Sequence, residues 1–325
     1  MTSAFYNAEL DIPIFALPPQ GQPTHDEEGR KLLWQLNKSL PGLKQAENLW
    51  HKKLESMIKN FSVDIQQSLA DLCLFVLKDV KGRLKLAVGT HVDDLVTIGC
   101  SSITQEFENY MKTILPINFK PLTFFLNISI VYDDVKGSVK LSQQAYVEQK
   151  LREYGMEQCK PSPTPLATVK LRAIKQGEKQ AINKKKYASV VGGFNYPTHM
   201  TRPDFAGPLN VLQRFTANPS VEHELALGHF MRYARGTADL GITYSVVDGS
   251  SEVKLESYAD ASFGAPDISQ GKLTGTTTTG YVIIIRELQY HGVLISRKGS
   301  QRFRQLRQNI TAPRRQLVRQ CFVGI

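Results

Sequence analysis

The segment from Cys73 to Gly99 constrains the fold most strongly, because its apolar residues come in short runs separated by polar turns: CLFVLKDVKGRLKLAVGTHVDDLVTIG. Leu84, Leu86 and Val88 alternate with polar or small residues. This alternation is typical of a strand with one buried face. Residues 80–83, which contain a glycine, indicate a turn before that strand. We therefore expect two consecutive β-hairpins in this segment.

Asp93 and Asp94 lie side by side at the expected tip of the second hairpin, just before the returning strand at residues 95–98. Asp is common in turns because its side chain can hydrogen-bond to nearby backbone, so the pair can be ordinary turn residues. The alternative is a cation site. Mg²⁺ prefers oxygen ligands and is usually held by one or two carboxylates together with substrate phosphates. The pattern alone leaves both interpretations open.

The remaining periodicity predicts a mixed α+β fold. Helices are expected at 31–60, 102–114, 143–154, 187–191, 205–215 and 221–235. Strands are expected at 122–132 and, beyond 242, at 253–262, 279–285 and 288–296. Residues 1–30 are rich in proline and indicate loops. Within 31–60 the apolar residues that share one helical face are interpreted as core: Leu43, Ala46, Trp50, Leu54 and Ile58.

Composition narrows the class of protein. Apolar residues make up 42% of the 325 residues and charged residues 22%, which is typical of a globular chain. The N-terminus lacks the basic and apolar regions of a secretory signal, and no apolar run is long enough for a membrane span. A cytoplasmic or nuclear location is expected. Four scattered cysteines argue against a zinc ribbon, and the net charge of +10 is compatible with a polyanionic partner.

The motif VDDL after a strand, with GLKQA about fifty residues before it, resembles the polymerase palm of copia-type retrotransposon reverse transcriptases. Several further segments resemble family motifs in the same order along the chain. AFYNAEL resembles AFLNGEL, and FFLNISI resembles YFLGIEI. The others span residues 153–166, 187–223, 232–245 and 257–282.

This resemblance implies an α+β fold with three parts: an incomplete palm sheet with helices at 1–136, a helical thumb or connection region at 137–240, and a truncated RNase H-like domain at 241–325. It implies RNA-directed DNA polymerase activity with attached RNase H, in which a primer 3′-hydroxyl attacks the α-phosphate of a deoxynucleotide. Mg²⁺, or Mn²⁺ in its place, would be the cofactor. The implied partners are an RNA template, a DNA primer or RNA–DNA hybrid, and deoxynucleotides, with no membrane.

The resemblance also implies site residues. Asp93 and Asp94 would lie in the palm metal site, and Asp260 would be the first metal carboxylate of RNase H. Phe125 and Leu126 would lie near the primer-supporting hairpin, although a core role explains both equally well. The segment implied to face the nucleotide and template comprises Gly42, Leu43, Lys44, Gln45 and Ala46. Lys44 is as readily explained as a solvated helix residue.

Departures from the family pattern predict a degenerate and catalytically defective chain. Aligned on AFYNAEL, the first metal Asp of the family falls one position before Met1. His91 replaces a Tyr before VDD, and Asn127 replaces a Gly. From Arg297 to Arg319 the chain has eight Lys or Arg and no acidic residue, where the family has a helix with a second RNase H carboxylate. A frameshift would explain this tail. The alternatives are a residual, non-catalytic nucleic-acid-binding protein and an inert transposon remnant.

Overall fold

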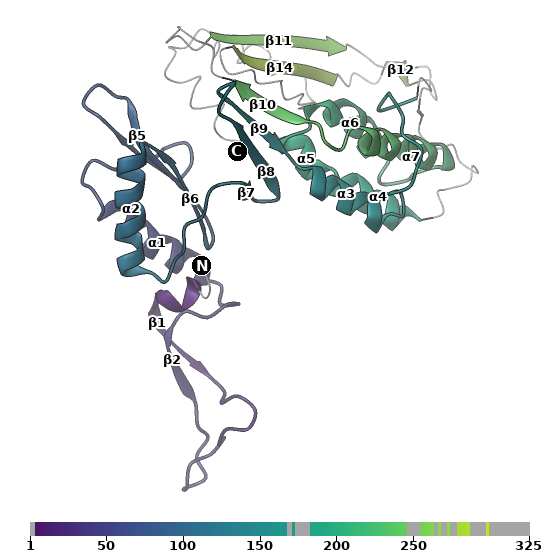
Figure 1. Ribbon diagram of the computed structural model, residues 1–325. Coiled ribbons are helices and arrows are strands. Elements are labelled where there is room, and N and C mark those ends of the chain that lie inside the picture. Colours follow the sequence, from purple (N-terminus) through teal and green to yellow (C-terminus); the bar gives the residue numbers. More distant parts are fainter. Residues whose placement is uncertain are drawn as a thin grey trace. The chain divides into compact units, whose positions relative to one another are not determined.

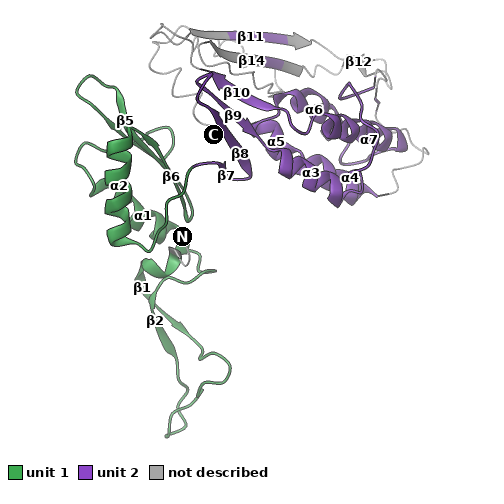
Figure 2. Ribbon diagram, viewed as in Figure 1, with its two compact units in different colours: residues 1–121 green, residues 122–325 purple. Residues whose placement is uncertain are grey.

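The computed structural model describes residues 4–167, 171–172, 183–245, 254–262, 266–267, 272–273, 278–286 and 297–298. The chain forms two compact units, residues 1–121 and 122–325 (Figure 2). Both contain helices and antiparallel sheets, which agrees with the expected α+β class. The three-part domain division stays a prediction. No helix in the described part of the chain is both long and apolar enough to cross a lipid bilayer.

Unit 1 is built on a four-stranded antiparallel sheet (Figure 1). Its strands lie side by side in the order of the chain: β3 (Gln66–Gln67), β4 (Leu74–Lys78), β5 (Leu84–His91) and β6 (Asp94–Gly99). The turn between β4 and β5 is closed by Asp79, whose carboxylate accepts from the backbone N–H of Arg83 at 2.8 Å and from its Nε at 2.6 Å. Both hairpins predicted from the alternating pattern are confirmed.

Two helices, α1 (Ala46–Lys59) and α2 (Ser101–Ile114), pack on one face of this sheet (Figure 1). Apolar side chains at helical spacing meet alternate residues of β4 and β5. The buried members of this core are Ala8, Trp50, Leu54, Met57, Ile58, Ile65, Phe75, Leu86, Val88, Phe107, Met111 and Leu115.

The expected helix at 31–60 is wrong in its first half. Residues Trp34–Lys38 form β2, which pairs antiparallel with β1 (Glu9–Ala16), so the loop expected at 1–30 also contains a strand. The apolar spacing that indicated a helix begins only at Leu43, and the turn around Gly42 separates it from β2. Because the β1–β2 ribbon buries little side-chain surface, it has no strong alternation to predict it.

Unit 2 begins with a second four-stranded antiparallel sheet in the order β10-β9-β8-β7. The strands are β7 (Phe124–Phe125), β8 (Ile128–Asp133), β9 (Ser138–Ser142) and β10 (Gly241–Ser245). The single strand expected at 122–132 is therefore wrong, because a tight turn divides it into β7 and β8.

Helices of unit 2 form its main core (Figure 1). They are α3 (Gln144–Glu153), α4 (Lys184–Gly193), α5 (Asn195–Met200), a 3-10 turn (Pro203–Phe205), α6 (Ala206–Gln213) and α7 (Val221–Gly236). Proline cannot continue a hydrogen-bonded helix interior. Accordingly the helix breaks at Phe194, and both Pro197 and Pro208 lie in a first helical turn.

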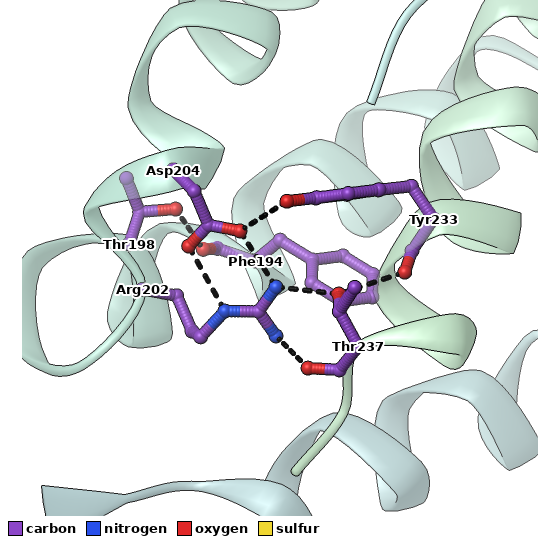
Figure 3. Close-up of polar contacts among 6 residues, drawn as sticks. All are labelled: Phe194, Thr198, Arg202, Asp204, Tyr233 and Thr237. Carbon is purple, nitrogen blue, oxygen red and sulfur yellow. Dashed lines mark hydrogen bonds and ion pairs between the residues drawn. The ribbon is translucent and has the colours of Figure 1, made fainter. Parts of the chain in front are cut away.

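An ion pair between buried Arg202 and partly exposed Asp204 bonds to residues at the C-terminal end of α7 and so joins the 3-10 turn to that helix (Figure 3). Arg202, whose side chain is 1% exposed, donates to both carboxylate oxygens of Asp204 at 2.9 and 2.7 Å and to the carbonyl oxygen of Thr237 at 2.7 Å. The hydroxyl of Tyr233 donates to Asp204 at 2.9 Å. The pKa of Tyr233 is raised, mainly because the phenol is partly buried and secondly because it is bonded to this carboxylate. The segments TRPD and RYARGT, which carry part of the resemblance, thus meet in a structural contact.

The described C-terminal residues form β11 (Lys254–Ser262), β14 (Thr278–Arg286) and β15 (Arg297–Lys298), in the order β11-β14-β15. A two-residue pairing joins β12 (Pro266–Asp267) to β13 (Lys272–Leu273). The strands expected at 253–262 and 279–285 are confirmed in their described parts. The strand expected at 288–296 and the basic tail beyond Lys298 lie outside the described residues.

Candidate functional site

Asp93 and Asp94 lie at the tip of the β5–β6 hairpin, as predicted. His91 and Asp94 face each other as the last cross-strand pair, so Val92 and Asp93 alone form the connecting turn. Val92 has a φ of +53°. A β-branched residue in this left-handed region is an outlier that costs on the order of 1–2 kcal/mol. The carboxylates therefore project from a strained piece of backbone.

A hydrogen bond from helix α1 holds this turn. The indole Nε1 of Trp50 donates to the carbonyl oxygen of Val92 at 2.6 Å. The Trp50 side chain is only 1% exposed and is packed among core residues of α1, α2 and the sheet. A buried N–H without an acceptor costs roughly 1–3 kcal/mol. The bond to Val92 avoids this cost for the indole and also restrains the turn.

Strand alternation assigns Asp94 to the sheet face opposite the helices. Leu86, Val88 and Thr90 of β5 are buried on the helical face, whereas His91, opposite Asp94, is exposed. Asp94 itself is exposed and Asp93 is half-buried. The tip of the hairpin is therefore open to solvent and able to receive a ligand.

The segment implied to face the nucleotide leads directly into helix α1. Gly42 has a φ of +94°, which glycine adopts without strain, and Lys44 is exposed. Leu43 and Gln45 are half-buried, and Ala46 is the buried first residue of α1. Trp50 follows Ala46 by one helical turn, about 6 Å along the axis. The structure therefore links this segment to the Asp93 turn through the Trp50 bond.

The other implied site residues belong to unit 2. Phe125 ends β7 and is half-buried, and Leu126 begins the two-residue turn to β8. Leu126 and Asn127 both have positive φ, at +48° and +58°. The hydroxyl of Tyr196 donates to the carbonyl oxygen of Leu126, and burial raises the pKa of Tyr196, so the phenol stays protonated. This turn has the same two-residue form as the Asp93 turn.

Asp260 lies on β11 opposite Gly280, two residues before the strand ends, and is exposed. It belongs to unit 2, and the metal role given to it by resemblance stays a prediction. In the described part of the chain, no group of three or more His, Cys, Asp or Glu side chains could hold a metal ion. Any cation site at the hairpin therefore rests on two adjacent carboxylates, a donor set that fits Mg²⁺ when substrate phosphates complete its coordination.

Sequence reasoning missed Trp50, Val92 and Tyr196 as residues that shape these turns. Trp50 was interpreted only as core, which its burial confirms, but its polar atom has a second role. A sequence signal existed only for the β7–β8 turn, because Asn127 stands where the resembled family has glycine. Asn is the residue other than Gly that best tolerates a left-handed backbone.

Comparison with known proteins places these features in a family. Residues 1–168 match the model of the family described as reverse transcriptase (RNA-dependent DNA polymerase). The chain is 31% identical over 288 residues to the retrovirus-related Pol polyprotein from transposon TNT 1-94 of Nicotiana tabacum, covering 86% of this chain and 21% of that protein. It is 27% identical to the corresponding polyprotein from transposon RE1 of Arabidopsis thaliana, covering 88% of this chain and 18% of that protein.

A shorter relative covers a similar region. The putative transposon Ty5-1 protein of Saccharomyces cerevisiae is 26% identical over 265 residues, which are 81% of this chain and 82% of that protein. The chain spans about a fifth of the length of the two plant polyproteins. The family match covers more than half of the chain and includes the GLKQA segment, Trp50 and the Asp93 turn. The chain therefore belongs to the reverse transcriptase (RNA-dependent DNA polymerase) family.

Proposed function

We propose that the chain is the polymerase part, with the beginning of an RNase H part, of a copia-type retrotransposon Pol polyprotein. Its task would be RNA-directed DNA synthesis. The observation that carries the proposal is the placement of Asp93 and Asp94 at an open hairpin tip whose backbone is held by Trp50. Backbone strain that persists because the surroundings hold it is often found at functional sites, and here the strained Val92 directly precedes two adjacent carboxylates.

In this proposal the sheet of unit 1 is the palm. The β7–β8 hairpin with Phe125 and Leu126 supports the primer, the helices of unit 2 form the thumb or connection region, and β11 with Asp260 opens the RNase H part. Support comes from the family match over residues 1–168 and from the order of the motifs along the chain. The ligands would be an RNA template, a DNA primer and deoxynucleotides.

Asp93 and Asp94 would hold Mg²⁺ or Mn²⁺. A bound divalent ion neutralises phosphate charge and favours the ionised form of an attacking hydroxyl. The protein contributes the position of the two carboxylates, set by the turn and by the bond from Trp50. The exposed ammonium of Lys44, on the segment leading into α1, supplies positive charge for a substrate phosphate.

We further propose that this chain polymerises slowly. Among the described residues there is no cluster of three or more possible metal ligands, and the hairpin tip carries two carboxylates that are adjacent in sequence. Two ions about 4 Å apart need ligands that span both, and two adjacent carboxylates provide few of them. His91, where the resembled family has Tyr, is a second departure next to the site.

Primer extension tests the polymerase proposal. The full chain is given poly(rA)/oligo(dT), dTTP and either Mg²⁺ or Mn²⁺, with Asp93→Asn as the matched control. We expect slow primer extension by the parent chain. The extension rate should be at least tenfold lower in the control, because the substituted amide cannot supply the anionic ligand that Asp93 provides. Extension that is equal in both proteins would contradict the assignment of Asp93.

A second candidate is nucleic-acid binding without catalysis, favoured by the net charge of +10. Binding through phosphate contacts weakens steeply with salt, because counterions are released. Strong salt-dependent binding of RNA or DNA with no extension would favour this candidate. Absence of both binding at low salt and a cooperative unfolding transition would indicate an inert remnant instead.

A further inference from the structure

We infer that Trp50 is a positioning residue for the carboxylates of the hairpin. Its indole N–H holds the carbonyl oxygen of Val92 and thereby sets the backbone from which Asp93 and Asp94 project. The inference deepens the proposed function and rests on it for the identity of the bound cation. The role of Trp50 in shaping the turn stands on the geometry of unit 1 alone.

The turn needs an external restraint. Two-residue hairpin turns favour Gly, Asn or Asp where the backbone is left-handed. Here Val92, a β-branched residue, has a φ of +53° and is 38% exposed, so packing of its own side chain gives limited support. Without a partner for its carbonyl oxygen, this residue would relax toward an extended or helical backbone.

Trp50 is a stiff donor. Its ring is buried with Leu54 and Ile58 of the same helix and with Leu86 and Val88 of β5. The indole nitrogen can only donate, and it has one hydrogen to give. Burial in this core keeps the N–H directed at one acceptor, the carbonyl oxygen of Val92, at a nitrogen–oxygen distance of 2.6 Å.

The restraint acts directly on the carboxylates. The carbonyl group of Val92 and the N–H of Asp93 belong to one planar peptide unit. Holding the oxygen sets the orientation of that plane, from which the Asp93 side chain starts, and Asp94 follows as the first residue of β6. Ala46, the last residue of the GLKQA segment, lies one helical turn before Trp50 in α1. Trp50 therefore also couples the GLKQA segment to the turn at Val92 and Asp93.

The experiment uses the full chain and two variants. Trp50→Phe keeps an aromatic ring in the core and removes the donor. Leu54→Ala, one turn further along the same buried face of α1, is a control that destabilises the core without touching the turn. Amide hydrogen exchange of residues 91–95 reports the turn without any metal, and Mn²⁺ affinity reports the carboxylates.

We expect Trp50→Phe to speed exchange of the turn amides about tenfold and to weaken Mn²⁺ binding several-fold, as loss of one restraining hydrogen bond implies. Leu54→Ala should leave Mn²⁺ binding near that of the parent chain. Unchanged turn exchange in Trp50→Phe, or equal losses of Mn²⁺ affinity in both variants, would overturn the inference. If the parent chain binds no Mn²⁺ through Asp93, the proposed function fails, while the exchange result still decides whether Trp50 shapes the turn.

Discussion

The turn at Val92 and Asp93 in unit 1 and the turn at Leu126 and Asn127 in unit 2 are built alike. Each joins two antiparallel strands through two residues, and each begins with a residue of positive φ that is not glycine. In both, an aromatic side chain on a helix donates to the carbonyl oxygen of the first turn residue: Trp50 to Val92, and Tyr196 to Leu126.

The two turns differ in the residues that adopt the left-handed backbone. Val92 at +53° and Leu126 at +48° are both bulky residues that disfavour it, but only Val92 is β-branched. The other left-handed residue of the second turn, Asn127, tolerates this backbone. The two donors also differ in burial: Trp50 is almost fully buried, whereas Tyr196 is half-buried. The turn with the β-branched residue thus has the more deeply buried donor, and it is the one that carries two adjacent carboxylates. Strain that persists because the surroundings hold it is often found at functional sites.

Removing each aromatic donor should give the largest contrast. Trp50→Ala leaves a cavity in a buried core and should lower the free energy of unfolding of unit 1 by about 3–5 kcal/mol. Tyr196→Ala should cost unit 2 roughly 2 kcal/mol, because its ring is only half-buried. Urea unfolding followed by far-UV circular dichroism measures both. Equal losses would show that the two supports are equivalent and would break the comparison.

Relieving the strain should separate stability from metal binding. Val92→Gly should raise the stability of unit 1 by about 1 kcal/mol, since glycine adopts a φ of +53° without strain. The same change should weaken Mn²⁺ binding, because the turn becomes free to move. Both tryptophans, Trp34 and Trp50, lie in unit 1, so tryptophan fluorescence during urea unfolding reports that unit.

Asn127→Gly is the matched control in the other turn. It should change stability by only a few tenths of a kcal/mol and leave Mn²⁺ binding unaltered. A Val92→Gly protein that gains stability and keeps its full Mn²⁺ affinity would argue that the strain has no role in positioning the carboxylates.

Removing only the phenol hydroxyl of Tyr196 should have a smaller effect. Tyr196→Phe keeps the edge-on contact with the Tyr146 ring, whose centroid is 5.5 Å away, and loses the bond to Leu126. We expect a loss of about 1 kcal/mol, the net contribution of one hydrogen bond. Hydrogen exchange should accelerate in the β7–β8 turn and remain unchanged in the β9–β10 pairing. Acceleration throughout the sheet would indicate a general loss of stability instead.

Mild acid should have the smallest effect, and it should act on unit 2. His223 is buried, its ring stacks on Phe215 at 3.8 Å, and burial lowers its pKa below 6.5. Because the unfolded chain binds a proton more readily than the folded one, this residue adds stability above pH 6.5 that is lost as the pH falls through its lowered pKa. His223→Gln keeps a capping side chain for Ser220 and removes the titration. Urea unfolding at pH 7 and pH 5 should show that the free energy of unfolding changes less with pH in this variant than in the parent chain.

Local pattern predicted the parts of the fold in which side chains alternate or repeat over several residues. The hairpins of residues 73–99 and the buried face of α1 follow from such patterns and are confirmed. Strands β1 and β2 were missed because an exposed ribbon needs no buried face. The turn between β7 and β8 was missed because its left-handed residues are Leu and Asn rather than Gly.

The position of the candidate site could be predicted, but its support could not. Adjacent aspartates after an alternating strand indicated a hairpin tip, and the structure places them there. The bond between Trp50 and Val92 joins residues 42 positions apart, so no local pattern specifies it. The sign of φ at Val92 is also hidden in the sequence, because a valine is a poor choice for that backbone and only the tertiary contacts keep it there.

Paramagnetic broadening by Mn²⁺ tests the cation site most directly. The indole nitrogen of Trp50 lies 2.6 Å from the carbonyl oxygen of Val92, the residue before Asp93. Trp34 on the β1–β2 ribbon provides the reference signal. We predict that Mn²⁺ added to the full chain broadens the Trp50 indole resonance before that of Trp34, and that the Asp93→Asn, Asp94→Asn double variant shows no such difference. Equal broadening of both resonances in the parent chain, or selective broadening that survives in the double variant, would contradict a cation site at this hairpin.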